Sequence, residues 1–113
     1  MTPPCPFCEI AADRAPATVI RRWPDALAIR PLNPVTEGHL LVLPVRHVAT
    51  AATDPHLTGR VASYAAALVA EVHWQANLIA NIGPEASQSV PHLHWHIVPR
   101  RYGDGLALPW PQH

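Results

Sequence analysis

Residues 91–99 read PHLHWHIVP, so three histidines alternate with large apolar side chains. Strict alternation predicts a half-buried β-strand, because residues two apart in a strand share a face. One face should carry the histidines: His92, His94 and His96. The other face should pack into a core: Leu93, Trp95 and Ile97. A lone histidine is most often structural, but three in register favour either a zinc site or nucleophilic catalysis by an imidazole.

The composition limits the classes of protein that this chain can belong to. It has 113 residues, 49% of them apolar, which suits a single domain over residues 1–113. The formal net charge is zero, so no overall field attracts nucleic acid or an anionic membrane, and neither is expected as a partner. No apolar run approaches the roughly 18 residues of a membrane span, and no basic-then-apolar leader is present. A cytoplasmic location is therefore expected.

Two cysteines two residues apart stand near the start of the chain, in the sequence Cys5-Pro6-Phe7-Cys8. This spacing can provide half of a structural zinc site, or it can form a redox dithiol. A redox dithiol is normally found between a strand and a helix of a βαβ unit, and no such unit surrounds these residues. The two readings stay open on the local sequence. Residues 9–14 should form a short helix that ends before Pro16.

The rest of the chain predicts an α+β domain with a five-stranded antiparallel sheet, one main helix and the short N-terminal helix. The expected strands are rich in β-branched and apolar residues: 18–23, 26–30, 39–44, 77–81 and 91–99. The core should span about residues 5–101, and residues 102–113 should form a tail without periodicity. A tryptophan in such a tail usually docks on the chain itself or on a partner subunit.

The main helix is expected over residues 54–74, with Asp54 as the cap and Pro55 in the first position. Apolar residues at spacings of three and four should form the stripe that faces the sheet: Leu57, Val61, Tyr64, Leu68, Val72 and Trp74. In the strand over residues 39–44, His39, Leu41 and Leu43 should share one face.

Taken together, these residues resemble the histidine-triad superfamily of nucleotide hydrolases and transferases. The resemblance covers nearly the whole chain from Cys5 to Arg101 and is specific in combination. It is carried by five groups of residues: His92-x-His94-x-His96, Asn81-x-Gly83 with Gln88-Ser89-Val90, Asn33-Pro34, the run from Gly38 to His47, and Phe7-x-x-Ile10. It implies an α+β sheet and a homodimer in which two sheets join edge to edge, with the tail at the interface.

The resemblance also implies a reaction and a set of roles. Family members release or transfer a nucleoside monophosphate, such as AMP, from a phosphoramidate or a phosphoanhydride. His94 corresponds to the nucleophile that forms a nucleotidyl-histidine intermediate, and His96 to a donor for a phosphate oxygen. His39 or a backbone carbonyl would hold the proton on the other nitrogen of the nucleophile. The remaining implied contacts are Ser89, Asn81 and Gln88 near the phosphate, and Phe7, Ile10 and Leu32 around a purine.

Some bacterial members carry an N-terminal Cys-x-x-Cys that is completed by two histidines. Here this implies a closed structural zinc site made of four residues: Cys5, Cys8, His47 and His92. His92 would then not serve as an acid or a base, which leaves His94 and His96 for the chemistry.

The sequence departs from the family pattern in two places. Pro31 stands where many members have an aspartate that contacts the ribose, so ribose recognition would pass to Asn33. Arg100 and Arg101 stand where many relatives have glycines. Because the transferase branch has glutamine at the third triad position, His96 favours a hydrolase. Two alternatives stay open: a nucleotide-binding or scaffold protein with negligible catalysis, and a hydrolase that uses the triad as an open zinc site.

Overall fold

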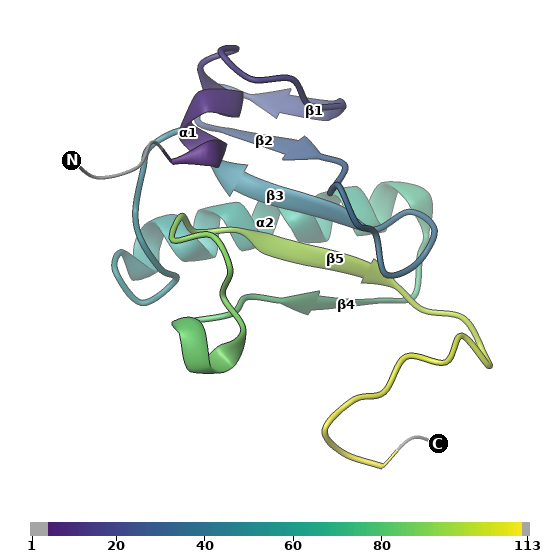
Figure 1. The fold of residues 1–113 in the computed structure, drawn as a ribbon. Coiled ribbons are helices and arrows are strands. Elements are labelled where there is room, and N and C mark those ends of the chain that lie inside the picture. Colours follow the sequence, from purple (N-terminus) through teal and green to yellow (C-terminus); the bar gives the residue numbers. More distant parts are fainter. Residues whose placement is uncertain (1–4, 112–113) are drawn as a thin grey trace.

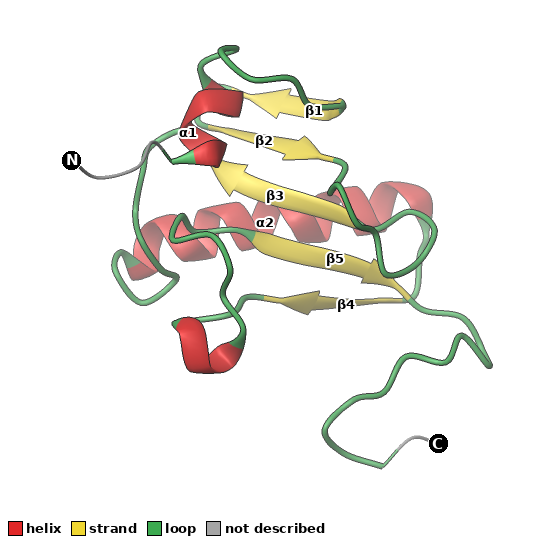
Figure 2. Ribbon diagram, in the orientation of Figure 1, coloured by secondary structure: helices red, strands yellow, loops and turns green. Residues whose placement is uncertain are grey.

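The computed structural model describes residues 5–111. Its elements follow one another along the chain as labelled in Figure 1: α1 (Pro6–Ala11), β1 (Val19–Trp23), β2 (Ala26–Ile29), β3 (Leu40–Pro44), α2 (Pro55–Val72), β4 (Ala76–Ile79), the 3₁₀ turn η1 (Pro84–Ala86) and β5 (Trp95–Pro99). The strands form one five-stranded sheet, and α2 is the only long helix of residues 5–111 (Figure 2). No helix in this range is long and apolar enough to cross a membrane.

The sheet is antiparallel throughout and has the strand order β1-β2-β3-β5-β4. The last strand in sequence therefore lies inside the sheet, between β3 and β4. In this register His96 faces Leu41 of β3 on one side and Ile79 of β4 on the other. The predicted fold class is confirmed, and the histidine segment is held by neighbours on both sides.

Alternation along the strands divides the apolar residues between two faces. One face packs under α2, with Leu40, Val42 and Ile97 in its core. The opposite face carries α1 and a smaller core around Phe7 (Figure 1). Leu41 and Leu43 belong to this second core, together with Leu27 and Ile29. The predicted alternation of the third strand is thereby confirmed.

The main helix begins as predicted and ends two residues earlier. The carboxylate of Asp54 accepts a hydrogen bond from the Leu57 N–H at 3.1 Å, and Pro55 occupies the first turn. His73 has a left-handed backbone with φ 55°, which ends the helix before Trp74. The prediction that Val72 belongs to the buried stripe is wrong, because this side chain is 47% exposed. The buried positions are Leu57, Val61, Ala65 and Leu68.

Two other predicted boundaries are corrected. The N-terminal helix spans Pro6–Ala11 rather than residues 9–14, because the Cys5 sulfur caps it by accepting from the Cys8 N–H at 3.3 Å. The last strand begins at Trp95 rather than at residue 91. The Leu93 N–H donates to the Val48 carbonyl at 2.8 Å, beyond the end of β3. This segment therefore runs along the turn that follows β3, outside the regular ladder.

Candidate active site and metal centre

The three triad histidines lie in a row on the α1 face of the sheet. The rings of His94 and His96 have centroids 5.0 Å apart, and the Phe7 ring meets His94 edge-on at 5.0 Å and His92 at 5.8 Å. Leu93 and Ile97 are buried in the opposite core. The histidines thus share a face as predicted, although only His96 belongs to the strand. His92 is fully buried, His94 is 6% exposed and His96 is partly exposed.

The protonation of His94 is fixed by a backbone carbonyl. Its Nδ1 lies 2.8 Å from the carbonyl oxygen of His92. Because a carbonyl oxygen only accepts, Nδ1 carries the proton and Nε2 keeps its lone pair. Burial also lowers the pKa of His94, which favours the neutral ring. The sequence left two candidates for this acceptor, and the structure assigns the role to the backbone.

His39 instead sets the tautomer of His96. The Val35 N–H donates to Nδ1 of His39 at 3.1 Å, so the proton of His39 is on Nε2. That nitrogen lies 3.0 Å from Nδ1 of His96 and donates to it. The proton of His96 is therefore on Nε2, where it can be donated to a bound oxyanion. Burial, with smaller contributions from the neighbouring His94 and His39, lowers the pKa of His96 to about 4.

Four potential metal ligands converge beside the triad. The ligand atoms of Cys5, Cys8, His47 and His92 all lie within 4.8 Å of one another. Nδ1 of His92 is 3.3 Å from the Cys5 sulfur, 3.5 Å from the Cys8 sulfur and 3.2 Å from Nδ1 of His47. The Cys8 sulfur is 3.4 Å from Nδ1 of His47.

These separations fit a tetrahedral metal ion. With Zn–S bonds of about 2.3 Å and Zn–N bonds of about 2.0 Å, tetrahedral ligand atoms stand roughly 3.3–3.8 Å apart. Nε2 of His92 is 2.9 Å from the Pro44 carbonyl oxygen and donates to it, which leaves Nδ1 free to bind a metal. Burial lowers the pKa of His92 to about 4, so the ring is neutral at pH 7. The four residues can hold a metal ion.

The segment before the triad is organised by two side-chain amides. Gln88 accepts from the Gly83 N–H at 2.8 Å and donates to the Ala49 and Val90 carbonyls at 2.8 and 3.0 Å. The Asn81 amide donates to the Ala86 carbonyl at 2.6 Å and closes η1. Both amides are therefore engaged in shaping the loop that carries Ser89. The Ser89 side chain is exposed.

The structure brings together only part of the predicted purine slot. Phe7 is buried, and Ile10 is partly buried against the same cluster. Leu32 is 97% exposed and makes almost no contact with the rest of the chain, and Asn33 beside it is also exposed. Of the residues predicted to surround a purine, Phe7 and Ile10 therefore lie in one cluster and Leu32 stands apart from it.

Two functional groups escaped the sequence analysis, the Val35 N–H and the Pro44 carbonyl. Both are backbone groups that fix the tautomer of a histidine. Any residue other than proline supplies an N–H, and every residue supplies a carbonyl, so no residue type in the sequence signals either role.

Comparison with known proteins agrees with this geometry. The HIT domain model matches residues 12–103. This chain belongs to the HIT domain family. The predicted resemblance and the prediction of a hydrolase are confirmed at the level of the family.

Several HIT relatives cover most of the chain. A HIT-like protein of Mycobacterium tuberculosis is 37% identical over 93% of this chain and 77% of its own length. An adenosine 5'-monophosphoramidase of Saccharomyces cerevisiae is 30% identical over 95% of this chain and 70% of its own. The crystal structure of a Zn-bound histidine triad protein from Mycobacterium smegmatis superimposes with a TM-score of 0.83 and 35% identity, covering 91% of this chain and 79% of that one.

Proposed function

We propose that this HIT protein is a hydrolase that releases a nucleoside monophosphate, preferentially AMP, from a phosphoramidate or a dinucleoside polyphosphate. The observation that carries the proposal is the 2.8 Å hydrogen bond from Nδ1 of His94 to the His92 carbonyl, which leaves Nε2 with a lone pair. The phosphoramidase of Saccharomyces cerevisiae among the relatives supports this substrate class.

In the first step, Nε2 of His94 attacks the α-phosphorus of the substrate. A P–N bond to the enzyme forms, and the bond from phosphorus to the leaving amine or phosphate breaks. The departing group takes the bonding electron pair and picks up a proton from solvent when it is an amine. The Nε2–H of His96 donates to a non-bridging oxygen, where negative charge grows in the transition state.

In the second step, water attacks the same phosphorus. The P–N bond to His94 breaks, its electron pair returns to Nε2, and the proton lost by water passes to the medium. Splitting one displacement into two lowers the barrier of each step. We assign Ser89 to the phosphate, and Phe7, Ile10 and Leu32 to the base. Asn33 would contact the ribose, because Pro31 stands where many family members have an aspartate. Asn81 and Gln88 would hold the segment that carries Ser89.

The role of His39 in positioning His96 leads to a test. His39→Ala is expected to lower kcat by about 10–100-fold, because His96 can then carry its proton on the wrong nitrogen. His39→Gln is the matched control, since its amide can accept from Val35 and donate to His96. We expect this variant to recover most of kcat with little change in KM. Equal activity of the alanine variant and the wild type would contradict the role.

The low pKa of His96 leads to an expected pH dependence of stability. Between its unfolded pKa of about 6.5 and its folded pKa of about 4, the unfolded chain binds more protons, so acidification destabilises the fold. His96→Asn should therefore lose less unfolding free energy than the wild type between pH 7 and pH 5, by roughly 1–2 kcal/mol. Urea titrations at both pH values measure this. Parallel losses in the two proteins would show that His96 titrates normally.

We infer that the metal is zinc and that its role is structural. Two thiolates and two imidazoles suit zinc, and four protein ligands leave no open position for water. The ion would tie α1, and with it Phe7, to the end of β3 and to His92. A structural zinc differs from the alternative of a hydrolase with an open zinc at the triad. That hydrolase would lose its activity when the metal is removed.

We also propose that the chain is a single domain over residues 1–113 that acts as a cytoplasmic homodimer. β4 is an outer strand of the sheet, and Leu78, Ile79 and Val72 near it are exposed. Arg100 anchors the start of the tail through bonds to Asn77 and Asp104. The tail that follows carries Trp110 and would lie at the interface. Sedimentation equilibrium distinguishes one chain from two.

A panel of substrates tests the reaction itself. Adenosine and guanosine phosphoramidates and dinucleoside polyphosphates are incubated with the zinc-loaded protein, and release of the monophosphate is measured. We expect turnover of at least one class, with adenosine preferred. Tight binding of monophosphate without turnover of any member would instead favour a nucleotide-binding scaffold.

A further inference from the structure

A cavity of about 530 Å³ lies beside the C-terminal end of α2 and reaches His39, the residue that positions His96. Its apolar walls include Ile20 of β1, Leu40 of β3 and Trp74, and one side is formed by the loop that joins β2 to β3. Leu40 and Trp74 of this lining belong to the core under α2, whereas His39 contacts His96 on the triad face. Its volume falls within the range of roughly 300–1,000 Å³ that is typical of small-molecule sites.

Two arginines line this cavity without a carboxylate partner. Among residues 5–111, neither Arg30 nor Arg101 forms an ion pair. Arg101 donates to the Thr36 hydroxyl at 3.0 Å and to the Glu37 carbonyl at 3.3 Å, and both of these acceptors are neutral. The Glu37 side chain is the one acid among the described lining residues, so the cavity keeps a net positive charge.

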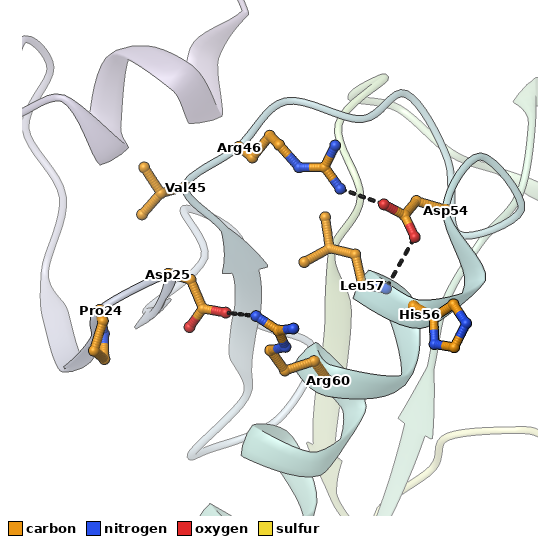
Figure 3. A pocket seen from close by; sticks show the side chains of 8 residues that line it. All are labelled: Pro24, Asp25, Val45, Arg46, Asp54, His56, Leu57 and Arg60. Atoms are coloured by element: carbon orange, nitrogen blue, oxygen red, sulfur yellow. Dashed lines mark hydrogen bonds and ion pairs between the residues drawn. The ribbon is translucent and has the colours of Figure 1, made fainter.

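A second cavity has charged lining residues that neutralise one another. Its volume is about 410 Å³, and its four charged side chains form two ion pairs, Asp25 with Arg60 at 2.8 Å and Arg46 with Asp54 (Figure 3). The charges cancel within the wall, and nothing there selects for a charged ligand. Of the two cavities, the one lined by Arg30 and Arg101 is therefore the one whose positive charge is not balanced within its own wall.

The β2–β3 loop packs closely against Trp74. Gly38 has φ +86°, and a Cβ at this position would stand 3.1 Å from the Trp74 ring and 3.2 Å from the Pro99 ring. The positive φ and this close approach both favour glycine, so the wall of the cavity is already formed in the structure. A preformed site has little ordering cost on binding.

We propose that this cavity is a second ligand site, which binds a small organic anion with an aromatic or apolar body and a single carboxylate or phosphate. The apolar walls would pack against the apolar body of the ligand. Arg30 and Arg101 would bind its carboxylate or phosphate by charge-assisted hydrogen bonds. None of the triad histidines lines the cavity, but His39, which positions His96, does. The site therefore adjoins the one assigned to the nucleotide, and its positive charge comes from two arginines that have no assigned role in hydrolysis.

The test follows the zinc-loaded protein by ¹⁵N NMR during titration with phenyl phosphate, phenylacetate and neutral benzyl alcohol. We expect saturable shifts at the Trp74 indole and at the Ile20 and Gly38 amides with at least one anion. The double variant Arg30→Gln with Arg101→Gln should weaken that binding by at least about tenfold. Arg22→Gln is the matched control, because this arginine pairs with Asp13 and does not line the cavity.

The two anions distinguish the source of the charge, since a preference for phenyl phosphate indicates a phosphorylated ligand and a preference for phenylacetate a carboxylate. Three results would overturn the proposal. They are the absence of saturable shifts at these residues with either anion, undiminished binding by the double variant, and binding of benzyl alcohol as tight as that of the anions. Shifts confined to the triad would count as the first of these.

Discussion

Replacing His94 with alanine is expected to reduce nucleotide hydrolysis by at least about 10³-fold, because it removes the nucleophile on which the two-step route depends. The loss should appear in kcat. Binding of nucleoside monophosphate should remain measurable, because Phe7, Ile10 and His96 are unchanged. Initial rates and calorimetric titration with AMP measure the two effects separately.

His56→Ala is the matched control for this variant. His56 is an exposed histidine in the first turn of α2, and it lines the neutralised cavity of Figure 3 rather than the triad. Its replacement should leave turnover unchanged. A His94→Ala enzyme with the rate of the wild type would show that another group attacks phosphorus.

The double replacement Cys5→Ser with Cys8→Ser is expected to abolish metal binding and to lower the unfolding free energy by roughly 2–4 kcal/mol, on the order of 10 °C in Tm. The four candidate ligands come from α1 and its N-cap, from the turn after β3 and from the triad segment, so a bound ion would link parts of the chain that are far apart in sequence. Calorimetric melting and metal analysis check both effects.

Chelation provides the second arm of this experiment. Removal of the metal from the wild type should reproduce the Tm of the cysteine variant, and chelator should not lower the Tm of the variant any further. Residual turnover below the melting temperature is expected, because His94 and His96 are not ligands. Complete and immediate loss of turnover, with the fold intact, would instead indicate a metal that takes part in the chemistry.

The sequence predicted the element types well, because the alternation and the capping signals are local. Asp54 and Pro55 marked the start of α2 correctly. The ladder of β5 starts late because Leu93 bonds to Val48, a residue far away in the sequence that spacing along the chain cannot identify. The early start of α1 has a local cause, because the Cys5 sulfur caps the helix by accepting from the Cys8 N–H. This cap was missed because the cysteines were considered only as metal ligands or a redox pair.

For the site, the sequence identified residue types but not the bonds that prepare them. The shared face of the histidines followed from strand periodicity. Only the structure could decide between His39 and a backbone carbonyl as the partner of His94, because every residue has a carbonyl and the sequence does not indicate which one accepts the hydrogen bond. The sequence also could not predict that Leu32 is exposed. It lies in a proline-rich loop, and such a loop has no periodicity that indicates which side chains face solvent.

The central claim is that Nε2 of His94 becomes bonded to phosphorus during turnover. The most direct test is intact-mass analysis after mixing the zinc-loaded protein with adenosine phosphoramidate and quenching in alkali, which preserves phosphohistidine. The account predicts an adduct of one adenylyl group, located by peptide mapping on His94 and absent from His94→Ala. Rapid turnover without any adduct, or an adduct on His96 or Ser89, would contradict it.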